Sequence, residues 1–173
     1  MAENFSGLDT FPKLLQHHAK TRPERPAIRE KDLGIWQTWS WRRFADEVRS
    51  LAGGLAAQGF KRGDHLAIVG DNRPRVYAAM CAAQCLGGIA VPLYQDAAAS
   101  EMAFPIQNAA IEFALAEDQE QVDKLLEILP QCARLRHLVP GQRGLRPLRQ
   151  AARDQLRHCQ RRRRSRCGIG LHF

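Results

Sequence analysis

Short apolar runs alternate with helix-like segments between His65 and Val139. These runs, each of five or six residues, are His65–Gly70, Ile89–Leu93, Ile111–Ala116 and Leu135–Val139. Apolar strands of this length, separated by helices, predict a parallel sheet that is covered by helices. The alternation therefore restricts this part of the chain to a layered α/β fold.

The segments between these runs carry helix signals. Pro74 suits the first position of a helix over Pro74–Leu86, where its missing N–H costs nothing. Ser100 is expected to cap the next helix, although Pro105 removes a hydrogen bond inside it at a cost of roughly 3 kcal/mol. A third helix is predicted over Gln119–Leu129 before Pro130, with one apolar face formed by Val122, Leu125, Leu126 and Leu129.

The first part of the chain predicts two helices and a hairpin. The first helix covers Phe11–Lys20, and the hairpin pairs Ala27–Lys31 with Ile35–Thr38 around a loop containing Gly34. Ser40 suits the N-cap of the second helix, which Gly59 ends. Its apolar face repeats at three- and four-residue spacing through Trp41, Phe44, Val48, Leu51, Ala52 and Leu55.

Charge divides the 173-residue chain into two regions. The net charge is +8, from 26 Lys and Arg against 18 Asp and Glu. Residues 1–139 hold 16 basic and 17 acidic residues, whereas residues 140–173 hold ten Arg, no Lys and one acid, Asp154. We therefore predict an α/β domain over residues 1–139 and an irregular or weakly helical arginine-rich tail over residues 140–173.

Composition excludes several classes of protein. With 45% hydrophobic residues the chain is neither disordered nor fibrous. No apolar run approaches the ~20 residues that a spanning helix needs, and Met1–Thr10 lacks the pattern of a secretory signal. Five cysteines in a chain this long do not form a disulfide scaffold, so we expect a cytoplasmic location.

Ligands of parallel sheets bind beyond the carboxyl ends of the strands, which here are the loops Gly70–Pro74 and Pro92–Asp96. Neither loop has the glycine spacing of a phosphate cradle. Turn and capping roles explain Asp71, Asn72 and Arg73.

Other chemically notable residues have structural explanations. Cys81 and Cys85 have a spacing that could ligate metal, but their Ala-rich helix favours buried core thiols. The tail residues His158, Cys159, Cys167 and His172 match no standard zinc spacing. We expect His17 and His18 on an exposed helix side, and core or rim packing for Trp36, Trp39 and Trp41.

The run Ala27–Asp96 resembles the N-terminal region of AMP-forming acyl-CoA synthetases, and Glu117–Leu129 resembles their bacterial long-chain fatty-acid branch. The resemblance covers roughly Thr10–Val139 and extends toward Gly144–Arg146. It implies a two-step ligase that activates an acid with Mg-ATP to an acyl-adenylate, then transfers the acyl group to coenzyme A. Pro105 departs from the apolar residue expected there, which puts the local helix in question.

The resemblance also shows what is missing. The family's phosphate-binding loop, similar to Y-T-S-G-T-T-G-x-P-K-G, occurs nowhere in the 173 residues, and neither do its adenine-binding segment, Y-x-x-G-D aspartate or catalytic lysine. We therefore assign no catalytic, cofactor-binding or metal-binding residue and expect no cofactor for this chain. ATP, Mg, CoA and a fatty acid are implied only for the full-length family, and a separately encoded remainder is a possible partner.

Two interpretations of the tail remain open. Arginine with Pro, Gly and Ala but no Lys is typical of GC-rich DNA translated out of frame, so we expect a frameshift between Val139 and Arg149. Alternatively, Arg161–Arg164 and Arg166 belong to a small basic interaction protein that binds nucleic acid or anionic surfaces weakly and without selection. The tail's only aromatic residue is Phe173, and it has no recognisable binding fold.

Overall fold

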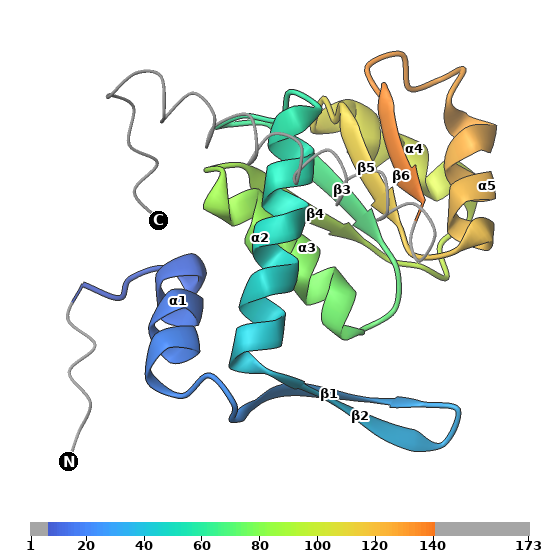
Figure 1. Ribbon diagram of the computed structural model, residues 1–173. Coiled ribbons are helices and arrows are strands. Elements are labelled where there is room, and N and C mark those ends of the chain that lie inside the picture. The colour runs from blue at the N-terminus through green and yellow to red at the C-terminus, as the bar shows by residue number, and fades with distance from the viewer. Residues whose placement is uncertain (1–6, 141–173) are drawn as a thin grey trace.

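The computed structural model describes residues 7–140, and the predicted tail lies outside this range except for its first residue, Pro140, which belongs to the last strand. The elements follow the predicted order (Figure 1). In chain order they are α1 (Phe11–Thr21), β1 (Pro26–Asp32), β2 (Ile35–Ser40), α2 (Trp41–Ala57), β3 (His65–Val69), α3 (Pro74–Cys85), β4 (Ile89–Leu93), α4 (Ala99–Asn108), β5 (Phe113–Ala116), α5 (Gln119–Ile128) and β6 (His137–Pro140).

The strands form two separate sheets. β1 and β2 are an antiparallel hairpin that extends away from the rest of the fold (Figure 1). The other four strands are all parallel, in the order β4-β3-β5-β6. The prediction of a parallel sheet flanked by helices and preceded by a hairpin is therefore confirmed.

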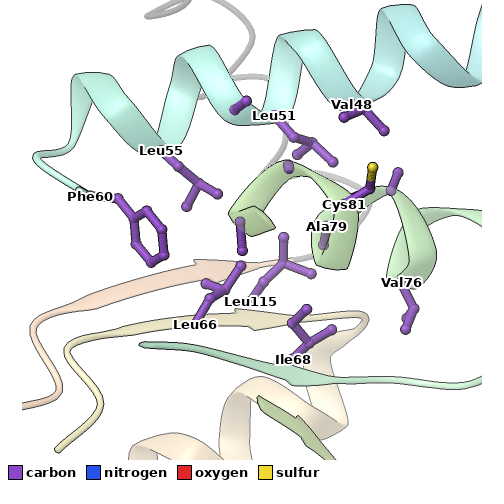
Figure 2. Packing of buried hydrophobic residues seen from close by; sticks show 14 of the residues in the cluster. Val48, Leu51, Leu55, Phe60, Leu66, Ile68, Val76, Ala79, Cys81 and Leu115 are labelled. Atoms are coloured by element: carbon purple, nitrogen blue, oxygen red, sulfur yellow. The ribbon is translucent and has the colours of Figure 1, made fainter. Parts of the chain in front are cut away.

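Alternation along the central strands divides the core between the two faces of the sheet. On β3, Leu66 and Ile68 pack with α2 and α3, whereas Ala67 and Val69 pack with α4 and α5. Figure 2 shows the first of these clusters, in which Leu51 and Leu55 of α2 lie above the sheet. Four fully buried alanines on α3, namely Ala78, Ala79, Ala82 and Ala83, let this helix approach the strands closely.

Helix α1 packs on the outer side of α2 and α3 and so adds a further layer. Thr10 caps α1 by accepting from the Lys13 N–H at 3.4 Å, and Ser40 caps α2 by accepting from the Arg43 N–H at 3.3 Å. Gly59, with φ of 94°, follows the end of α2 as predicted.

Helix α4 differs from its prediction. It begins at Ala99, so Ser100 lies inside the helix and is not the cap. The Glu101 carboxylate instead accepts from the Ala98 N–H at 3.0 Å, which orders the helix start. The helix continues through Pro105 without interruption, so the question raised by this proline is settled in favour of a helix.

The apolar face of α5 is also shifted. Val122 and Leu125 are buried as predicted, but Leu126 is 47% exposed, and Ile128 takes the inward position instead. The reason is the helical period: at 3.6 residues per turn, Val122, Leu125 and Ile128 span an arc of about 120°, and Leu126 lies about 40° beyond its edge.

Candidate functional site

A cleft lies beside the carboxyl ends of β3 and β5, where ligand sites of parallel sheets occur. It has a volume of about 260 Å³ and is walled by the hairpin, α2, the start of α3 and the end of β5. Its charged lining residues are Glu30, Asp32, Arg43, Arg73, Arg75 and Glu117. We call this cavity the strand-end cleft.

Glu117 organises one wall of the strand-end cleft. It follows β5, and its Oε2 accepts from the Asp71 N–H at 2.6 Å while its Oε1 lies 3.0 Å from Arg73 Nε. A Cβ on Gly70 would lie 2.7 Å from Glu117 Oε2, so the glycine makes this approach possible. The carboxylate therefore joins the loop after β3 to the end of β5.

The opposite wall comes from the hairpin and α2. Trp39 is 3% exposed, and the Arg43 guanidinium carbon lies 4.3 Å from the centre of its ring. This stacking holds a cation at the mouth of the cleft. The lining then contains three arginines against three carboxylates, a balance that gives no strong attraction for a polyanion.

The loop residues Asp71, Asn72 and Arg73 do form a turn, as predicted. Asp71 Oδ1 accepts from the Asn72 N–H at 2.7 Å, and Asn72 Oδ1 accepts from the Tyr77 hydroxyl at 3.3 Å. Arg73 is the N-cap residue of α3 but makes no side-chain capping bond, because a guanidinium has no acceptor for the backbone N–H groups; it pairs with Glu117 instead. No sequence signal links these two residues, because their contact depends on the pairing of β3 with β5.

A second cavity, of about 500 Å³, lies between α1, β1, α2 and α3 and is almost wholly apolar. His18 lines it, and its ring centre lies 4.5 Å from that of Trp41. His17 and His18 are half-buried, so the expected exposed helix side is wrong; His18 packs against Trp41 of α2. Of the tryptophans, Trp39 is in the core, Trp41 is half-buried, and Trp36 is 65% exposed on β2.

The two helix thiols contact each other. Cys81 is buried and Cys85 is half-buried, and the hydrogen bond between them raises the pKa of Cys81 and lowers the pKa of Cys85. Within residues 7–140 no group of three or more His, Cys, Asp or Glu side chains is placed to hold a metal ion. The residues His158, Cys159, Cys167 and His172 lie outside the described residues.

The strand-end cleft does not fit the triphosphate of ATP. Glu30, Asp32 and Glu117 would face phosphate charge, and Arg73 is already engaged by a carboxylate. The helix that starts there opens with Pro74, which has no N–H to donate. The charged lining of this cleft therefore opposes the binding of a nucleotide triphosphate.

The fold, with its parallel sheet, flanking helices and leading hairpin, places the chain in a class of α/β proteins with solved members. It superposes on the N-terminal domain of FACL13 from Mycobacterium tuberculosis with a TM-score of 0.72 at 19% identity, covering 80% of this chain and 35% of that one. A fatty acyl CoA synthetase of the same organism gives a TM-score of 0.71 at 18% identity, covering 80% and 28%. Identities this low show a shared fold.

The chain belongs to the AMP-binding enzyme family, whose model matches residues 15–161. It is 31% identical over 116 residues to an uncharacterized protein of Mycobacterium tuberculosis, covering 67% of this chain and 65% of that protein. It is 27% identical over 121 residues to a long-chain-fatty-acid–CoA ligase of Rattus norvegicus, covering 70% of this chain and 18% of the ligase. The chain thus matches part of the N-terminal domain of acyl-CoA ligases and spans only a fraction of their length.

Two further findings concern the domain boundary predicted at Val139 and the question of a membrane-spanning helix. The family match continues past Val139 to residue 161, so the resemblance extends beyond the break in composition. Among the helices of residues 7–140, none is long and apolar enough to span a bilayer.

Proposed function

We propose that this chain is the N-terminal portion of an AMP-forming long-chain fatty-acid–CoA ligase and does not catalyse either step of that reaction alone. The observation that carries the proposal is the coverage: the chain spans 18% of the rat ligase and 28% of the mycobacterial synthetase structure. The sequence signatures that would bind ATP occur nowhere in its 173 residues.

In this proposal ATP, Mg and CoA bind to parts of the ligase that follow the described fold. The composition of the strand-end cleft supports this, because balanced charge and an engaged Arg73 suit a protein interface better than a triphosphate. The described residues then serve as a scaffold whose sheet and cleft pack against the remainder of the enzyme.

The proposal also names a substrate class, the long-chain fatty acids. Long-chain-fatty-acid–CoA ligases of Rattus norvegicus, Mus musculus and Xenopus laevis are all among the relatives, at 25–27% identity. A 2-succinylbenzoate–CoA ligase of Salmonella typhimurium is 29% identical over 105 residues, and its name gives the competing acid class. Assays therefore include both a long-chain fatty acid and an aromatic acid.

A mixing assay tests the proposal. The pure chain, a long-chain ligase lacking the portion that this chain matches, and the two together are assayed for acid-dependent acyl-CoA formation. We expect product only from the mixture and only with the long-chain acid. Product from the pure chain would contradict the assignment as a partial ligase, and a preference for the aromatic acid would contradict the long-chain substrate.

A second candidate function rests on the ten arginines of residues 140–173, which favour weak binding of polyanions. Binding of a random-sequence nucleic acid is measured over a salt titration, with the whole chain and with a chain ending at Val139. Affinity that does not depend on the tail would contradict this function.

A further inference from the structure

The charge of the folded region is unevenly distributed. Between residues 96 and 133 the sequence contains eight acidic residues, and Lys124 is its only basic residue. The near-neutral total for residues 1–139 hides this acidic stretch, because the preceding residues carry an opposite excess.

Four of these eight acids, Glu101, Glu120, Asp123 and Glu127, are exposed on α4 and α5, which pack against each other and against one face of the sheet. On α5 the exposed positions recur at spacings of three and four residues, so they share one side of the helix. We define the acidic face as the exposed residues Glu101, Phe104, Glu120, Asp123, Leu126 and Glu127.

The acidic face also includes exposed apolar side chains and carries little compensating charge. Phe104 is 74% exposed and Leu126 is 47% exposed. Lys124 pairs with Glu120 at 2.9 Å, and Asp123 accepts only an uncharged donor, Gln119, at 2.7 Å. The strand-end cleft differs, because its lining contains as many arginines as carboxylates.

The chain itself supplies a complementary segment. Residues 141–173 contain ten arginines and one acid, and they end in the apolar residues Ile169, Leu171 and Phe173. They follow β6, the edge strand of the sheet that contacts α5. At roughly 3.3 Å per residue, even a short part of this segment spans the ~15 Å length of a ten-residue helix.

We propose that residues 141–173 bind the acidic face of the same molecule. Arginines of the tail pair with Glu120, Asp123 and Glu127, and guanidinium groups stack on the exposed ring of Phe104. The effective concentration of a segment tethered beside its site reaches millimolar values, so many weak ion pairs suffice for occupancy. This inference does not depend on the proposed ligase function.

Trypsin cleavage at Arg161–Arg164 in the full chain tests the proposal, because a bound arginine resists the protease. The variant E120Q/D123N/E127Q removes three charges from the acidic face. The control D9N/E24Q/D46N removes three exposed charges elsewhere and matches its net charge. At low salt we expect the acidic-face variant to be cut at least about threefold faster than the wild type, and the control to be cut like the wild type.

Further measurements make the test decisive. A synthetic peptide of residues 141–173 is digested in parallel to correct for the effect of salt on trypsin itself. Relative to this peptide, the tail of the wild-type chain should be protected at low salt and should lose that protection at high salt. This comparison needs no variant, so it holds even if a variant fails to fold. Protection should not change with chain concentration. Equal cleavage of all three proteins, an equal gain in both variants, or protection that rises with concentration would overturn the proposal. The last result would indicate binding between two copies.

Discussion

Two glycines of this fold sit where any side chain would collide with a neighbour. A Cβ on Gly88 would lie 2.3 Å from Phe60 Cε1 and 2.9 Å from the Asp64 carbonyl oxygen. Phe60 is 4% exposed and packs edge-on against Phe113, so its ring has little freedom to move. At Gly70 the collision is with Glu117, whose carboxylate orders the strand-end cleft.

Gly88→Ala is expected to lower the free energy of unfolding by about 1–3 kcal/mol, because overpacking forces the Phe60 ring or the backbone to shift. Urea denaturation measures the loss. Gly34→Ala is the control: its φ of 82° is strained for alanine, at about 1 kcal/mol, but no atom lies within 4 Å of the added carbon. A loss at Gly88 no larger than at Gly34 would contradict the close approach.

The two interactions of Glu117 can be tested separately with two substitutions. Glu117→Gln keeps an acceptor for the Asp71 N–H but removes the ion pair with the half-exposed Arg73, so we expect a loss below about 1 kcal/mol. Glu117→Ala removes both and should cost about 1–2 kcal/mol. Urea denaturation of both variants shows the order, and equal stability of Glu117→Ala and the wild type would contradict the role assigned to this carboxylate.

At the scale of elements, the order and type of every helix and strand were predictable because each has local signals. Ser40 marks the start of α2, Pro74 opens α3, and the apolar strands stand out from their surroundings. The start of α4 was not predictable from Ser100, because Glu101 orders that end instead. The strand-end cleft could not be predicted from the sequence, because its residues come together only when β3 pairs with β5.

Ser40 and Ser100 should differ in how much they stabilise the helices in which they lie or which they precede. Ser40→Ala should cost about 1 kcal/mol, because the hydroxyl accepts from the Arg43 N–H at the start of α2. Ser100→Ala should change stability by less than about 0.5 kcal/mol, because Ser100 lies within α4 and alanine favours helix. Thermal unfolding of both variants measures the contrast, which fails if Ser100→Ala is the more damaging.

Replacing Pro105 tests how much a proline inside α4 lowers the free energy of unfolding. Pro105→Ala restores an N–H within α4 and removes the clash of the ring with the preceding turn. We expect an increase in unfolding free energy of about 1–3 kcal/mol, measured by urea denaturation. A decrease would show that the local geometry of α4 depends on the proline.

For the molecule as a whole, the unpaired edges of the parallel sheet are the feature that bears most directly on the family assignment. Among the described residues, β4 and β6 each pair along one side only, and Ile89 on β4 and Tyr94 directly after it are exposed. Unpaired edges and exposed apolar groups favour association. This arrangement agrees with a chain that spans only a fraction of its ligase relatives.

We therefore expect the pure chain to bind a dye that reports exposed apolar surface and to be poorly soluble. Sizing chromatography and dye fluorescence measure both properties. A monodisperse monomer that melts cooperatively and binds no dye would count against the view that the fold is completed by further ligase sequence.

The most direct test of the central claim is acid-dependent ATP–pyrophosphate exchange by the pure full chain. This reaction reports formation of the acyl-adenylate and, unlike simple ATP binding, is not mimicked by attraction of phosphate to the arginines. The account predicts no exchange above a protein-free background with any fatty acid. Exchange that depends on the acid and saturates with ATP would contradict it.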